Sequence, residues 1–165
     1  MICIRPRLLG CCLPPMRQVE GPNFTIDLEE GVAVVRTFKR ADLDSVGLSD
    51  AAVQLRQLCS ELTVDGKITG LVVDLRRTPG AVGPRVEQAY SDIAGAWDST
   101  GQRVSFLVLA DAMQHMQITR IVTKAAPRCG AVFTDRNEAR VFAGSSGTGA
   151  NTAISKLDRP SRVRR

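Results

Sequence analysis

Two short runs of apolar and β-branched residues open the interpretable part of the chain. Residues 24–28 alternate apolar and polar side chains, and residues 32–38 are rich in valine. The Glu-Glu-Gly turn between them, residues 29–31, is short enough to join neighbouring antiparallel strands. The pattern therefore predicts a β-hairpin.

Beyond the hairpin, helix-like and strand-like patterns alternate. Helices are predicted where apolar residues recur every three or four positions, and strands where a short run is almost wholly apolar. Ser49, Asp111 and Thr134 are suitable N-caps, and Pro84 suits a first helical turn. The predicted helices are residues 49–62, 84–97, 112–124 and 135–142, and the later strands are residues 71–75, 104–109 and 130–133.

The element order ββαβαβαβα predicts a single α/β domain. Strands joined through helices form parallel pairs with right-handed crossovers. We therefore expect a mixed, mostly parallel five-stranded sheet with an N-terminal hairpin and about four helices over residues 23–144. Residues 1–22 are expected to be a disordered extension, and residues 145–165 a disordered basic tail, because neither shows an apolar period. Trp97 ends the apolar stripe of its helix and is expected at least partly in the core.

The net charge of +5 arises at the ends of the chain. Residues 16–145 hold 15 basic against 16 acidic side chains, whereas residues 146–165 alone add +4. A nucleic-acid binder carries its cations on a folded face, so nucleic acid is not an expected partner. No apolar run approaches the roughly 20 residues of a membrane span. The five cysteines lack metal-site spacing and fit a reducing compartment, so we expect a cytoplasmic protein.

The segment after the strand at residues 71–75 is the most informative part of the chain. Partners and ligands of open α/β sheets sit just beyond the carboxyl ends of the strands. The candidate partner-binding or regulatory residues there are Asp74, Arg76, Arg77, Thr78, Gly80 and Arg85.

These candidates do not form a catalytic set, so we expect neither an enzyme nor a cofactor. His115 is the only histidine, and Gly80 and Gly83 are too sparse for a dinucleotide loop. The two arginines after Asp74 are interpreted either as an anion site or as solvated residues paired with acids such as Glu87. Thr78 is either a turn residue or a phosphoacceptor.

The methionines of the third predicted helix also leave two interpretations open. Met113 and Met116 could pack in the core, or they could form an adaptable partner-binding surface.

Three short motifs resemble the STAS superfamily, in its divergent bacterial branch of anti-sigma-factor antagonist-like and CRAL-TRIO-like domains. They are VVDLR at residues 72–76, QITR at residues 117–120 and VFTDRNEA at residues 132–139. Together with the element order, the resemblance covers roughly residues 24–144. In antagonists, a serine after the strand-ending acid is phosphorylated by a partner kinase. Asp74 matches that acid, whereas Thr78 does not align with the phosphoacceptor.

The resemblance implies a non-enzymatic module of bacterial signalling that regulates by protein–protein interaction. Its partner would be another protein, such as a kinase or regulatory factor, bound through the loop after Asp74 and the helix at residues 84–97. The CRAL-TRIO side of the resemblance implies an alternative, a carrier of a small ligand such as a lipid or nucleotide. Self-association into a homodimer through a sheet edge or helix face is a further possibility.

Overall fold

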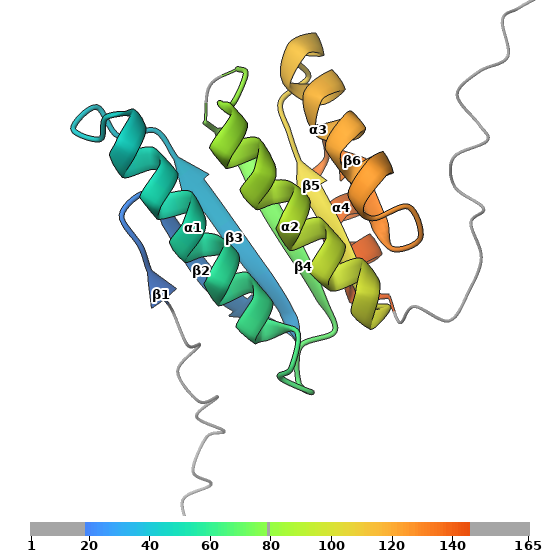
Figure 1. Ribbon diagram of the computed structural model, residues 1–165. Helices are drawn as coiled ribbons and strands as arrows, with labels where there is room; N and C mark the ends of the chain where they lie inside the picture. Colours follow the sequence, from blue (N-terminus) through green and yellow to red (C-terminus); the bar gives the residue numbers. More distant parts are fainter. Residues whose placement is uncertain (1–18, 79, 146–165) are drawn as a thin grey trace, which may run out of the picture.

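The computed structural model describes residues 19–78 and 80–145 and shows one sheet between two helical layers (Figure 1). The six strands lie side by side in chain order. They are β1 (Val19–Glu20), β2 (Phe24–Glu29), β3 (Val32–Phe38), β4 (Gly70–Arg77), β5 (Arg103–Leu107) and β6 (Gly130–Phe133). β2 is antiparallel to both of its neighbours, β1 and β3, and the strands from β3 to β6 are parallel.

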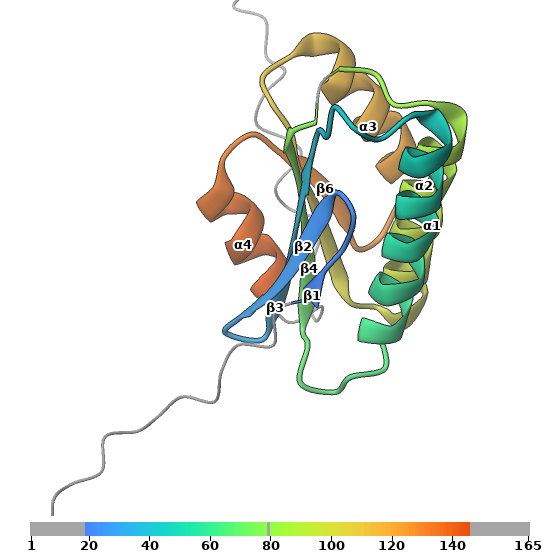
Figure 2. The ribbon, with the colours of Figure 1, turned by 90° about the vertical axis from the view of Figure 1, so that its left-hand side faces the viewer.

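Three helices cover one face of the sheet and a fourth lies on the other (Figure 2). The first layer holds α1 (Ser45–Leu62), α2 (Pro84–Thr100) and α3 (Ala112–Ala125), and the second holds α4 (Arg136–Gly144). Trp97 of α2 is fully buried in the core of the first layer, where its indole Nε1 donates to the Cys59 carbonyl at 3.1 Å. The predicted burial of Trp97 is thereby confirmed.

Over residues 19–78 and 80–145, the single α/β domain with four helices confirms the prediction, but the sheet has six strands rather than five. The additional strand, β1, lies within the predicted disordered extension of residues 1–22, where Val19 pairs with Ile26. Two residues are too few to show a strand period, so only the pairing partner reveals this strand. The expectations for residues 1–18 and 146–165 lie outside the described residues.

Two helix starts differ from the prediction. The helix expected at residue 49 begins at Ser45, because the Asp44 carboxylate accepts a hydrogen bond from the Gly47 amide at 2.8 Å and caps an earlier turn. The last helix is capped by Asp135 rather than Thr134, since the Asp135 carboxylate accepts from the amides of Asn137 and Glu138.

The parallel strands bring four loops to one margin of the sheet, here called the carboxyl edge. These loops follow β3, β4, β5 and β6, and they lead into α1, α2, α3 and α4 respectively. Backbone bonds join neighbouring loops, since the Lys39 amide donates to the Arg77 carbonyl at 3.2 Å and the Val108 amide to the Phe133 carbonyl at 2.9 Å. The carboxyl edge is therefore where the predicted site should lie.

The second helical layer depends on the absence of a side chain at Gly70. A Cβ atom at Gly70 would collide with the Ala143 backbone in the last turn of α4. This close approach lets Ala139 and Ala143 pack on Val72 and its neighbours in a second, smaller core. The same helix is tied to β2 by ion pairs from Arg136 and Arg140 to Glu29.

We predict that Gly70→Ala lowers the free energy of unfolding by about 1–3 kcal/mol, because the added methyl group must displace α4. The matched control is Gly66→Ala, where a Cβ atom meets nothing within 4 Å. Urea unfolding of both variants measures the difference. Equal midpoints for the two variants would show that α4 does not depend on the close approach.

Candidate functional site

A buried glutamine organises the carboxyl edge. Gln114 in the first turn of α3 is 2% exposed. Its Oε1 accepts from the Leu109 amide at 3.1 Å, and its Nε2 donates to the carbonyls of Leu75 and Thr78 at 3.2 and 3.1 Å. Gln114 thus joins the ends of β4 and β5 to the start of α3. It was not among the predicted site residues, although its spacing from Ile118 and Ile121 places it on a buried stripe.

A second glutamine, Gln117, holds the far end of the β4–α2 loop, of which residues 78 and 80–83 are described. Its Oε1 accepts from the Val82 amide at 3.0 Å, and its Nε2 donates to the Val82 carbonyl at 3.1 Å. The same Nε2 donates to Glu87 Oε2 at 3.0 Å. The other carboxylate oxygen of Glu87, Oε1, accepts from Arg120 Nη2 at 2.7 Å. The hydrogen bond from Gln117, followed by that from Arg120, lowers the pKa of Glu87. Both ends of the loop are therefore fixed to α3.

The six predicted residues do not form one cluster. Asp74 and Arg76 point away from the first helical layer, because alternate residues of β4 face opposite sides and Leu75 lies in the main core. The Asp74 carboxylate accepts from the Arg76 Nε and Nη2 at 3.0 and 2.8 Å and from its amide at 3.1 Å. Arg76 is thus paired with Asp74 rather than with Glu87.

The remaining predicted residues lie on or beside the β4–α2 loop. Arg77 and Arg85 are exposed, and the structure gives neither side chain a partner within the described part of the chain. Thr78 is half-buried, and its hydroxyl donates to the Leu75 carbonyl at 2.7 Å, as a turn residue does. Gly80 has a φ of +49°, a conformation that glycine adopts without strain.

Exposed apolar side chains lie on, or just before, the same part of α3 as the two glutamines that bind this loop. Leu109, Met113 and Met116, here called the apolar patch, are 44%, 64% and 71% exposed. The two methionines are three residues apart in α3 and so share one helix face. Their exposure excludes the core-packing interpretation.

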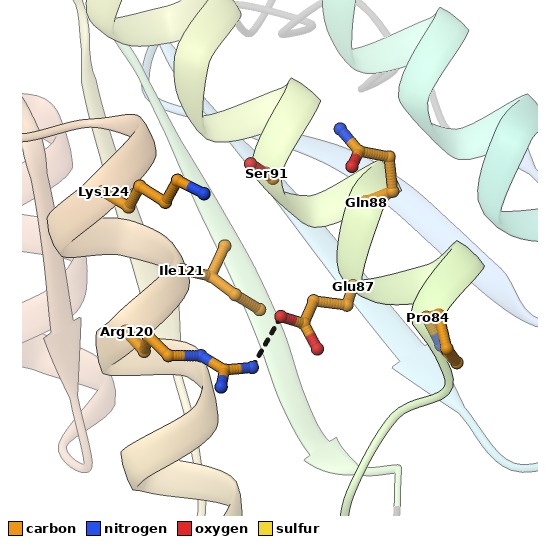
Figure 3. A pocket seen from close by; sticks show the side chains of 7 residues that line it. All are labelled: Pro84, Glu87, Gln88, Ser91, Arg120, Ile121 and Lys124. Atoms are coloured by element: carbon orange, nitrogen blue, oxygen red, sulfur yellow. Dashed lines mark hydrogen bonds and ion pairs between the residues drawn. The ribbon is translucent and has the colours of Figure 1, made fainter.

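Two hollows on the described surface are open grooves between helices. The α2–α3 groove has a volume of about 480 Å³ and is shown in Figure 3. It is lined by Pro84, Glu87, Gln88, Ser91, Arg120, Ile121 and Lys124. The groove between α1 and α2 has a volume of about 610 Å³ and is lined by Arg56, Gln57, Ser60, Glu61, Val64 and Asp92.

The chemistry available at the carboxyl edge is limited. His115 is half-buried, and its Nδ1 lies 3.5 Å from the Thr119 hydroxyl. Among residues 19–78 and 80–145, no group of three or more His, Cys, Asp or Glu side chains could hold a metal ion. None of the helices in these ranges combines the length and apolar character of a membrane span.

Comparisons with known proteins find little similarity. No protein-family profile and no curated protein matches the chain. Among solved structures, a Geobacillus kaustophilus enoyl-CoA hydratase is 12% identical with a TM-score of 0.41, over 55% of this chain and 39% of that chain. Pseudomonas aeruginosa DspI is 18% identical with a TM-score of 0.35, over 53% of this chain and 41% of that chain. These matches span less than half of either neighbour, and neither supports a conclusion about function.

We predict that Gln114→Leu lowers the free energy of unfolding by about 1–3 kcal/mol, because it leaves buried backbone groups without partners. Amide exchange in the β4–α2 loop should accelerate as well. Gln88→Leu is the control, since exposed Gln88 donates a side-chain bond to Asp92 alone. Hydrogen exchange followed by mass spectrometry tests this, and unchanged loop protection in Gln114→Leu would contradict the assigned role.

A second prediction concerns acid stability. Partial burial acts to raise the pKa of Asp74, but the hydrogen bonds from Arg76 and the charges of Arg76 and Arg136 outweigh it and lower that pKa. A lowered folded-state pKa means that ionised Asp74 contributes stability above its unfolded value of about 3.9. This contribution is lost as the pH falls through the folded pKa.

Asp74→Asn should therefore be less stable than the unmodified protein at pH 6, with a difference that shrinks below about pH 4. Asp50→Asn, which makes the same substitution at an exposed position of α1, is the matched control. Thermal unfolding across this pH range measures both variants. A constant difference for Asp74→Asn at every pH would refute the electrostatic explanation.

Proposed function

We propose that this chain is a non-enzymatic regulatory module of STAS type that binds another protein. The proposed contact surface is the β4–α2 loop with the first turn of α2 and the first two turns of α3. The observation that carries the proposal is the exposed apolar patch at the start of α3, where Gln114 and Gln117 hold both ends of the loop. A surface ordered before binding loses little conformational entropy when a partner docks.

Two of the three residues of the apolar patch are methionine, which is enriched at protein interfaces. Burial of a Leu or Met side chain contributes about 1.5–3 kcal/mol, so three such residues are sufficient for a few dominant contacts. Methionine side chains adapt to partners of different shape. Arg77 and Arg85 provide guanidinium groups that are available for bidentate bonds to a partner.

The acidic residues of the carboxyl edge have structural roles, which favours binding over catalysis. Asp44, Asp111 and Asp135 each cap a helix, with the carboxylate accepting from a backbone amide at 2.8 Å.

Cys59 and Cys129 are free thiols, from which we infer a cytoplasmic setting.

A small-ligand carrier is the second candidate function. It would need an enclosed, mostly apolar pocket. Large side chains such as Leu75, Phe106 and Ile118 fill the core between the sheet and the first helical layer, and the two hollows described above are open. The protein-binding function is therefore better supported.

Site-specific photocrosslinking in the cells that produce the protein tests the proposed contact surface. A benzoylphenylalanine in place of exposed Met116 should yield one discrete adduct with another protein. The same group in place of Val141, which is 73% exposed on α4 at the opposite face, serves as the control and should not yield that adduct. Arg77→Glu combined with Arg85→Glu should abolish the Met116 adduct while leaving the thermal midpoint unchanged.

The outcomes distinguish the candidate partners. An adduct with twice the mass of the chain would identify a second copy as the partner. Equal adducts from positions 116 and 141, or no adduct from position 116, would refute the proposed surface.

A further inference from the structure

One face of α3 changes from apolar to cationic along its length. Met113, Met116, Arg120 and Lys124 are all exposed, and their spacings of three, four and four residues place them in one row. At 1.5 Å per residue, this row, here called the α3 ridge, is about 16 Å long. It borders the α2–α3 groove, to which Arg120 and Lys124 contribute lining.

The cationic half of the α3 ridge has more positive charge than its surroundings neutralise. Figure 3 shows Arg120 reaching Glu87 across the groove, whereas Lys124 extends over it without an ion pair. Lys124 forms no hydrogen bond or ion pair within the described residues, and its charge acts on Glu87 only through a longer-range attraction. Glu87 is the only acidic residue among those that line the groove, so one positive charge remains uncompensated there.

We propose that the partner segment is an acidic amphipathic helix that lies along the α3 ridge and the α2–α3 groove, an inference that rests on the proposed function. Apolar residues at one end of this helix would cover Met113 and Met116. Acidic residues about two turns farther along it would pair with Lys124 and share Arg120. A helix suits the site because the residues of the α3 ridge recur at spacings of three and four, which one face of a second helix can match.

The arrangement of charges favours a protein over a nucleic acid or an anionic membrane. A phosphate backbone or headgroup layer requires a continuous cationic surface. Here Glu87 lies within the groove, and Asp111 caps the end of α3 that carries the methionines. A peptide, in contrast, can place acidic and apolar side chains separately against each half of the ridge.

Selection of random displayed peptides on the purified full-length chain tests the partner chemistry. We expect the enriched peptides to carry apolar residues at spacings of three or four, followed by Asp or Glu. A synthetic copy of an enriched peptide should bind about tenfold more weakly to Lys124→Glu, and more weakly in high salt. Lys67→Glu, which reverses another exposed lysine whose side chain forms no hydrogen bond or ion pair within the described residues, should leave its affinity unchanged.

Met113→Ser combined with Met116→Ser should abolish peptide binding and preserve the fold, because both side chains are exposed. Enrichment of neutral or basic peptides, enrichment of none, or binding that Lys124→Glu leaves intact would overturn the inference. Binding of duplex DNA or phosphatidylserine vesicles in place of peptides would overturn it too. If photocrosslinking at position 116 succeeds while this selection fails, only the partner chemistry is wrong. If the selection succeeds while photocrosslinking at position 116 fails, the proposed function is rejected.

Discussion

Burial of β4 on both of its faces is the constraint on which the rest of the structure depends. Leu71, Val73 and Leu75 fill the core beneath the first helical layer, while Val72 lies under α4. A strand with two apolar faces needs helices on both sides of the sheet. The nine-residue α4 is enough because the strand becomes polar at Asp74 on that face. One short helix therefore completes the fold, and the ion-paired end of β4 needs no cover.

Buried polar groups then fix the loops that this sheet brings together. Gln114 forms hydrogen bonds with backbone groups at the ends of β4 and β5. Asp98 forms hydrogen bonds with backbone amides at the opposite end of the first helical layer. The Asp98 carboxylate accepts from the amides of Arg128 and Cys129 at 3.0 and 2.7 Å, which ties α2 to the segment before β6. The folded protein loses stability if one hydrogen-bond partner of such a buried side chain is missing. Each one therefore selects a single arrangement of the backbone around it.

Local patterns in the sequence were sufficient to predict most helices and strands, but not the contacts between them. Proline at the start of α2 and the apolar run of β6 are local signals, and those elements begin where predicted. β1 has no local signal, because its stability comes from pairing with β2. The first turn of α1 was missed because Gly47 indicates a loop, although Asp44 could have been recognised as an earlier cap.

In the candidate site, too, local patterns predict some features and not the contacts between distant residues. The alternation of a β-strand already places Asp74 and Arg76 on one side, so their mutual pairing could have been predicted from sequence. The two distant partners of Gln114 could not, because they lie on β4 and in the loop after it, 36 to 39 residues away. Exposure of Met113 and Met116 also depends on which face of α3 meets the sheet. A helical stripe containing glutamine and methionine does not determine that orientation alone.

The carboxyl edge separates residues that stabilise the fold from residues that are free to bind. Gln114 and the capping aspartates have their hydrogen bonds filled within the domain. Met113, Met116 and Arg77 are exposed and contribute little to folding. Exposed side chains of this kind change stability by only about 0.5 kcal/mol when substituted. Substitutions at these positions can therefore change the proposed binding specificity without loss of the platform beneath them.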